Sequence, residues 1–83
     1  MERAGKSTYT ARYKKLRDLL VSARRDAGLT QAEVAAALRK PQSYVSKVES
    51  GERRIDMVEL LDFLRVVSID EMRFIKALLG KVR

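Results

Sequence analysis

A run of amides, hydroxyls and one ammonium group follows the single proline of the chain, Pro41. If residues 42–50 form a helix, the turn of about 100° per residue directs Val45 and Val48 to one side. The opposite side then presents only hydrogen-bonding groups: Gln42, Ser43, Ser46, Lys47 and Ser50. A helix face that meets only water usually carries Asp or Glu. This acid-free face instead suits base edges and phosphate oxygens.

Other kinds of chemistry lack the residues they need. The 83-residue chain has no Cys and no His, so it has no disulfide, thiol nucleophile, imidazole base or zinc finger. The remaining Ser, Lys and carboxylate groups form no recognised nucleophile-and-base set, and we expect no enzyme, no metal site and no cofactor. The length predicts one small domain. No apolar run approaches the roughly 20 residues that span a bilayer, so we expect a soluble, cytoplasmic protein without a membrane partner.

The net charge of +7 is concentrated in two parts of the chain. The excess of Lys and Arg lies in residues 1–17 and 31–54, whereas the remaining residues are balanced. A localised basic footprint on a small domain suggests a polyanionic partner, most commonly a nucleic acid. From the charge alone, the alternative to a polyanionic partner is an ordinary basic surface that contacts only water.

Apolar periodicity and capping residues predict five helices and no strand. Residues 1–8 are predicted to be a flexible basic arm, and residues 9–83 a single domain. A first helix over 9–27 ends before Gly28, and a second over about 31–39 is opened by a Thr30 and Glu33 capping box. Pro41 starts the third helix, about 42–50, and Gly51 closes it. Asp56 caps a fourth helix through residue 67, and a fifth runs from residue 68 or 70 to 80.

Two short helices joined by about three residues have the dimensions of a helix-turn-helix. Residues 29–54, LTQAEVAAALRKPQSYVSKVESGERR, and the following DMVELL resemble the Cro- and phage-repressor-type helix-turn-helix family, also called the xenobiotic-response-element type. The resemblance covers about residues 13–70. It implies an all-α, compact five-helix, lambda-repressor-like fold that binds operator DNA as a dimer, with the third helix in the major groove.

The resemblance also implies roles for individual residues. Gln42 resembles the base-reading glutamine, which suits adenine; Ser43 is another base-facing position, and Lys47 could reach guanine or a phosphate. Gln31 looks like the glutamine that binds phosphate at a helix start. Backbone or supporting contacts are expected from Arg39, Lys40, Tyr44, Ser46, Ser50, Arg53 and Arg54. For Tyr44 there are two alternatives: packing against the turn, or touching a phosphate or a thymine methyl group.

Other matching positions are expected to be structural. Arg24 and Glu49 resemble a family salt bridge between the first and third helices, and Glu33 is expected only to cap. The sequence departs from the family where Arg39 and Lys40, and separately Ser68, stand at places that usually hold glycine. A residue with a side chain in left-handed geometry costs about 1 kcal/mol there.

Large apolar residues between positions 55 and 69 wrap further around a helix than packing on one side requires. We expect the surplus to form a symmetric dimer contact, although a generously packed monomer core is the alternative. The predicted dimer residues are Val58, Leu61, Phe63, Val66, Phe74 and Leu78. A dimer would place two third helices about 34 Å apart on a palindromic site.

The leading hypothesis is a sequence-specific regulator of transcription that binds double-stranded DNA, either a small dimeric repressor or an autoregulatory controller. The alternative is a protein-interaction module, such as an antitoxin that covers a toxin with its apolar C-terminal surface. The two hypotheses share one fold, and both activities can coexist in one chain.

Overall fold

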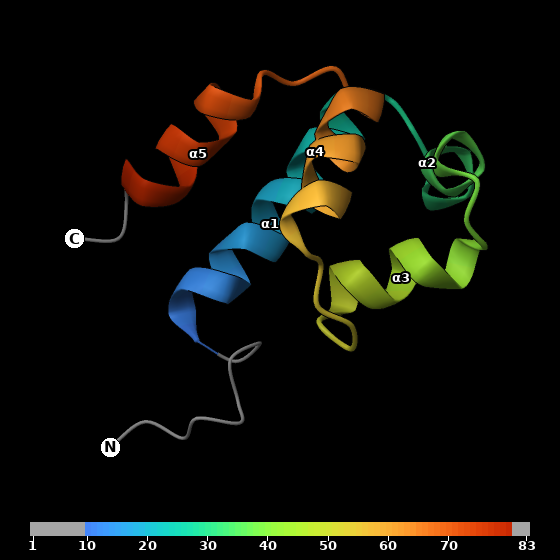
Figure 1. Cartoon of the computed structure of the whole chain (residues 1–83), viewed down its shortest axis with the longest axis horizontal. Coiled ribbons are helices and arrows are strands. Elements are labelled where there is room, and N and C mark those ends of the chain that lie inside the picture. Colours follow the sequence, from blue (N-terminus) through green and yellow to red (C-terminus); the bar gives the residue numbers. More distant parts are fainter. Residues whose placement is uncertain (1–9, 81–83) are drawn as a thin grey trace.

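The computed structural model describes residues 10–80, which form five helices and contain no strand (Figure 1). The helices are α1 (Ala11–Asp26), α2 (Gln31–Leu38), α3 (Gln42–Ser50), α4 (Met57–Val66) and α5 (Glu71–Gly80). The predicted all-α, five-helix class is therefore confirmed. The predicted basic arm over residues 1–8 lies outside the described residues and stays a prediction.

Capping residues set the helix starts largely as the sequence predicts. Thr30 Oγ1 accepts a hydrogen bond from the Glu33 backbone N–H at 3.0 Å, and Glu33 Oε1 accepts one from the Thr30 N–H at 2.8 Å. Asp56 and Glu59 form a second capping box at the start of α4. These reciprocal bonds satisfy N–H groups that have no partner within the helix.

Two helix starts differ from the expectation. The first helix begins at Ala11, because Thr10 caps it by accepting a hydrogen bond from the Tyr13 N–H at 3.1 Å. The apolar periodicity predicted a start at residue 9. Periodicity shows which residues face the core, but it does not identify the capping residue that sets the helix start. Pro41 takes the N-cap position, with an extended ψ of 154°, one place before the first helical turn.

The turn between α2 and α3 places Arg39 in left-handed geometry, with φ 59° and ψ 43°. Ser68 has φ 60° after α4. Both residues thus adopt the backbone conformation that glycine takes more readily, at a cost of about 1 kcal/mol each. In the α2–α3 turn, the Lys40 N–H donates a hydrogen bond to the Ala35 carbonyl at 2.9 Å.

In the core, α1 packs against α3 and α5, and α2 packs against α3 and α4. In Figure 1, α2 and α3 occupy one end of the view and α5 the other. Val45 and Val48 are fully buried, so they attach α3 to the core as predicted. The Tyr13 hydroxyl accepts a hydrogen bond from the buried Ile55 N–H at 3.1 Å, which ties the loop after α3 to α1.

Two residues predicted at the dimer surface lie inside the single chain. Phe63 is 0% exposed and Phe74 is 2% exposed, so the prediction is wrong for both. Their rings are the largest fully buried side chains of the described residues, and both belong to the hydrophobic core. The apolar surplus counted along the sequence is therefore partly core, because a small domain must bury large rings to be stable.

Candidate nucleic-acid interface

One face of α3 is exposed and polar. Its exposed residues are Gln42, Ser43, Ser46, Lys47 and Ser50, and its buried residues are Tyr44, Val45, Val48 and Glu49. The structure thus separates the predicted contact residues from the packing residues as helical geometry requires. Glu49, the acid of this helix, is turned away from the exposed face. The face therefore offers amide, hydroxyl and ammonium groups without a carboxylate from α3.

The start of α3 carries no side-chain cap, because Pro41 stands at the N-cap position and makes no such hydrogen bond. The first N–H groups of a helix lack partners within it and carry the positive end of the helix dipole. Gln42 and Ser43 occupy this exposed turn. An anion or a base-edge acceptor would therefore be favoured at this end of α3.

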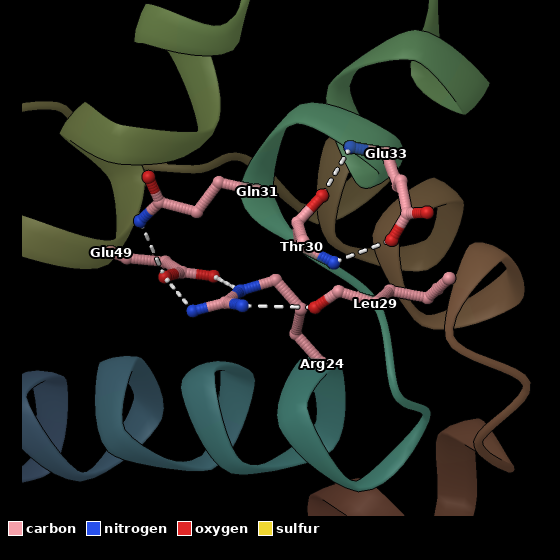
Figure 2. Close-up of polar contacts among 6 residues, drawn as sticks. All are labelled: Arg24, Leu29, Thr30, Gln31, Glu33 and Glu49. Atoms are coloured by element: carbon pink, nitrogen blue, oxygen red, sulfur yellow. Dashed lines mark hydrogen bonds and ion pairs between the residues drawn. The ribbon is translucent and has the colours of Figure 1, made fainter.

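Arg24 of α1 and Glu49 of α3 form the predicted salt bridge (Figure 2). Arg24 Nε donates to Glu49 Oε2 at 2.7 Å, and Arg24 Nη2 donates to Glu49 Oε1 at 3.0 Å. Both residues are buried, and the hydrogen bonds to Glu49 raise the pKa of Arg24 above its ordinary value. Arg24 Nη1 also donates to the Leu29 carbonyl at 3.0 Å, so the pair fixes the start of α2 as well.

Gln31, the predicted phosphate ligand at the start of α2, belongs to the same network. Its Nε2 donates to Glu49 Oε1 at 2.9 Å, which links α2 to α3 (Figure 2). An amide nitrogen has two N–H groups, and this contact uses one of them. Sequence reasoning gave Gln31 and Glu49 separate roles and missed this contact, because it joins side chains 18 positions apart.

Tyr44 packs within the protein, which is the first of its two predicted alternatives. Its side chain is 8% exposed, and its ring lies beneath two cations, Lys40 Nζ at 5.1 Å and Arg53 Cζ at 4.7 Å from the centroid. Burial raises the pKa of Tyr44. Such cation–π contacts attach the turn before α3 and the loop after it to one ring.

Arg53 was predicted to contact the DNA backbone, but its guanidinium is already engaged. Nη1 and Nη2 donate to Oε1 and Oε2 of Glu59 at 3.1 and 3.0 Å. This pairing raises the pKa of Arg53 and lowers that of Glu59. A phosphate contact would have to share or replace the Glu59 pair. Of the predicted backbone contacts, Arg53 is thus far more firmly tied to the protein than the exposed residues of the α2–α3 turn.

The other predicted contact residues are exposed beside α3. Arg39 and Lys40 project from the turn before the helix, and Arg54 follows it with its Cζ 4.7 Å from the centroid of the Tyr13 ring. Ser46 is exposed on the helix, and Ser50 donates through Oγ to the Lys47 carbonyl at 3.2 Å. The structure therefore brings cations to both ends of α3.

Apolar side chains are exposed on α4 and α5. Of the remaining predicted dimer residues, Val58 is 67% exposed, whereas Leu61, Val66 and Leu78 are half-buried. The prediction omitted three exposed apolar residues: Met57 and Met72 at 60% and Leu79 at 51%. Met72 and Leu79 stand two positions before and five after the buried Phe74, so helical phase could have indicated their exposure. Met57 stands three and seven positions before the buried Leu60 and Leu64, so helical phase alone would place it on their face.

No helix among residues 10–80 has the length and apolar character needed to cross a bilayer.

Comparison with known proteins identifies the family. The Helix-turn-helix family model matches residues 20–71, which include both helices of the motif. A solved structure, the XRE-family like protein from Pseudomonas syringae pv. tomato str. DC3000, is similar over 99% of this chain and 100% of its own, with 44% identity and a TM-score of 0.87. No curated protein matches. The chain therefore belongs to the XRE-type helix-turn-helix family of DNA-binding transcription regulators.

Proposed function

We propose that this protein regulates transcription by binding a specific double-stranded DNA sequence through the major groove. In this proposal it acts as a small dimeric repressor or an autoregulatory controller on a palindromic operator. The observation that carries the proposal is the exposed face of α3, which holds hydrogen-bonding groups and no carboxylate because Glu49 is turned inward to Arg24. Such a face is suited to the acceptors and donors of base edges.

Base reading is assigned to Gln42, Ser43 and Lys47. The Gln42 amide has a donor and an acceptor in one plane, which allows two hydrogen bonds to adenine. Lys47 lies one turn beyond Ser43 on the same exposed face, where it is assigned to guanine or a phosphate. These side chains extend from a helix whose inner valines are fully buried, so the backbone behind them is fixed.

Phosphate contacts are assigned to residues that flank this face. Gln31 retains one amide N–H at the start of α2, and the exposed cations of the turn lie before α3. The supporting set is Arg39, Lys40, Ser46, Ser50 and Arg54. If six to ten phosphates are neutralised, the affinity falls by roughly 10³ to 10⁵ between 50 and 200 mM salt.

Dimerisation is assigned to the exposed apolar side chains of α4 and α5, which include Met57, Val58, Met72 and Leu79. Exposed methionine and aliphatic side chains gain free energy when a second surface removes them from water. A two-fold dimer presents two α3 helices about 34 Å apart, which corresponds to half-sites about ten base pairs apart.

The same apolar side chains favour a second candidate, an antitoxin that covers a partner toxin. Sedimentation separates the two assignments. A chain that forms dimers alone, and binds one palindromic duplex as a dimer, supports the homodimeric regulator. A chain that stays monomeric until a second protein is added supports the interaction module.

A competition titration tests DNA specificity. A labelled duplex, enriched from a random pool by the protein, is competed with itself and with a scrambled duplex of the same composition. The proposal expects the enriched duplex to compete at least about 10³-fold better. Equal competition by both duplexes would refute sequence-specific binding.

A further inference from the structure

The last turn of α3 is held by a second arginine of α1. Arg17 Nη1 donates to the Ser50 carbonyl at 3.1 Å. The guanidinium also lies against Gly51, because a Cβ added to Gly51 would come within 3.0 Å of Arg17 Cζ and Nε. Gly51 has φ +89°, a conformation that favours glycine in any case. The absence of a side chain at Gly51 therefore permits both the turn and the close approach of Arg17.

The two arginines of α1 act on neighbouring residues of α3. Arg17 and Arg24 are seven positions apart, so they lie on the same face of α1, about 10 Å from each other along its axis. Arg24 binds the side chain of Glu49, and Arg17 binds the backbone of the next residue, Ser50. The carbonyls of a last helical turn lack partners within the helix, and a cation also complements the negative end of the helix dipole.

The contact with Ser50 uses only part of the Arg17 guanidinium. Its Nε is buried without a hydrogen-bond partner, which costs free energy. Arg17 places a flat, charged guanidinium against the C-terminal end of α3, at Ser50 and Gly51.

The end of α3 that Arg17 holds lies opposite the end that carries Gln42. The helix has nine residues and is therefore about 13 Å long. A tilt of about 10° around its last turn would move the Gln42 end by about 2 Å, most of the length of a hydrogen bond. Base contacts at one end of α3 thus depend on how firmly the other end is held.

We propose that Arg17 is a positioning residue that determines how selectively α3 reads DNA, without contacting the DNA itself. This inference rests on the proposed function, since it concerns the selectivity of the same interface. It predicts that loss of Arg17 weakens binding to the preferred sequence and leaves binding to other DNA nearly unchanged. A residue that contacts a phosphate would weaken both.

The test compares Arg17→Gln and Arg17→Lys with wild type on two probes: a duplex enriched from a random pool by wild type, and a scrambled duplex. Arg73→Gln is the matched control, because it removes one charge from an exposed residue of α5, at the far end of Figure 1 from α3. Fluorescence anisotropy at several salt concentrations gives each affinity and its salt dependence. Thermal unfolding monitored by circular dichroism shows that each variant is folded at the titration temperature.

For Arg17→Gln we expect the affinity for the enriched duplex to fall about tenfold, the loss typical of one weakened base contact. The scrambled duplex should be bound within about twofold of wild type, with a salt slope like that of Arg73→Gln. The affinity of Arg17→Lys for the enriched duplex should lie between those of wild type and Arg17→Gln. A lysine still supplies a cation to the Ser50 carbonyl but has no flat group to lie against Gly51.

Combination with Gln42→Ala adds a readout that a purely stabilising role would not change. If Arg17 acts by positioning Gln42, the double variant should lose less affinity for the enriched duplex than the product of the fold-losses of the two single variants. Fold-losses in affinity that multiply in the double variant would overturn the inference. A lower melting temperature with unchanged selectivity would also overturn it. Equal weakening on both duplexes with a shallower salt slope would show a phosphate contact instead. A wild-type protein that binds both duplexes equally would refute the proposed function, and with it this inference.

Discussion

Arg24 and Glu49 join α1 to α3 through two parallel hydrogen bonds of 2.7 and 3.0 Å. The Glu49 carboxylate also accepts a hydrogen bond from Gln31 at 2.9 Å. One buried acid therefore holds the donors of α1 and of α2 against α3. The relative orientation of the three helices at the interface depends on this carboxylate.

Replacement of Glu49 by Ala should destabilise the fold by about 3 kcal/mol, because it leaves the buried Arg24 charge without its partner. Urea unfolding followed by circular dichroism measures the change. Glu52→Ala, which removes an exposed acid three residues further on, is the control and should change the stability by less than about 0.5 kcal/mol. A loss below about 1 kcal/mol for Glu49→Ala would contradict the structural role of the pair.

This ion pair also shows how far a sequence can predict such a site. Arg24, Glu49 and the polar face of α3 follow from helical phase and from resemblance, because both depend on spacing along the chain. The contacts of Gln31 with Glu49, of Arg53 with Glu59 and of Arg17 with Ser50 depend on how helices cross. Their geometry appears only after packing, so the sequence alone did not predict them.

The dimer prediction illustrates the same limit. A count of apolar residues shows a surplus but does not show which members fill the core. Phe63 and Phe74 are core residues, whereas Met57, Met72 and Leu79 are exposed. Large rings gain most from full burial, and the methionines are left outside.

Ser68 adopts φ 60° after α4, so its replacement by Gly should relieve backbone strain. We expect Ser68→Gly to stabilise the protein by up to about 0.5 kcal/mol, since the relief of about 1 kcal/mol is partly offset by the added entropy of the unfolded chain. Ser22→Gly makes the same change at an exposed position inside α1 and should destabilise by about 0.5 kcal/mol. Thermal and urea unfolding of both variants provide the comparison. Destabilisation by Ser68→Gly would show that this conformation carries no strain.

Glu59 should make the fold sensitive to acid. Its hydrogen bonds to Arg53 hold its pKa below the ordinary value, so the folded protein binds this proton less tightly than the unfolded chain does. The stabilisation is present above the unfolded pKa of about 4.3 and is lost as the pH falls through the folded value. Glu59→Gln removes this titration, and its stability difference from wild type should shrink as the pH falls from about 5 to 3.

The same substitution in an Arg53→Met background is the control for the Glu59 prediction. Without the guanidinium, the main cause of the lowered pKa is absent, and the stability difference should vary much less with pH. Urea unfolding at each pH supplies the values. A difference that stays constant in the wild-type background would refute the role of the Arg53 pair.

Val58 is 67% exposed, so a charge at this position should leave the monomer folded. We expect Val58→Glu to change the unfolding free energy of the monomer by less than about 0.5 kcal/mol. In the proposed dimer the buried charge should weaken association at least about tenfold. Sedimentation equilibrium measures association, and Ser22→Glu is the control for an added exposed charge. Unchanged association for Val58→Glu would remove Val58 from the proposed contact.

Selection of bound duplexes from a random pool, carried out in parallel with wild type and Gln42→Ala, tests most directly whether α3 reads bases. Wild type should enrich two inverted half-sites about ten base pairs apart. Gln42→Ala should bind the wild-type site more weakly by about 1 to 3 kcal/mol and lose its preference at one position in each half-site. A pool that wild type leaves without enrichment, or identical preferences for both proteins, would contradict base reading by this helix.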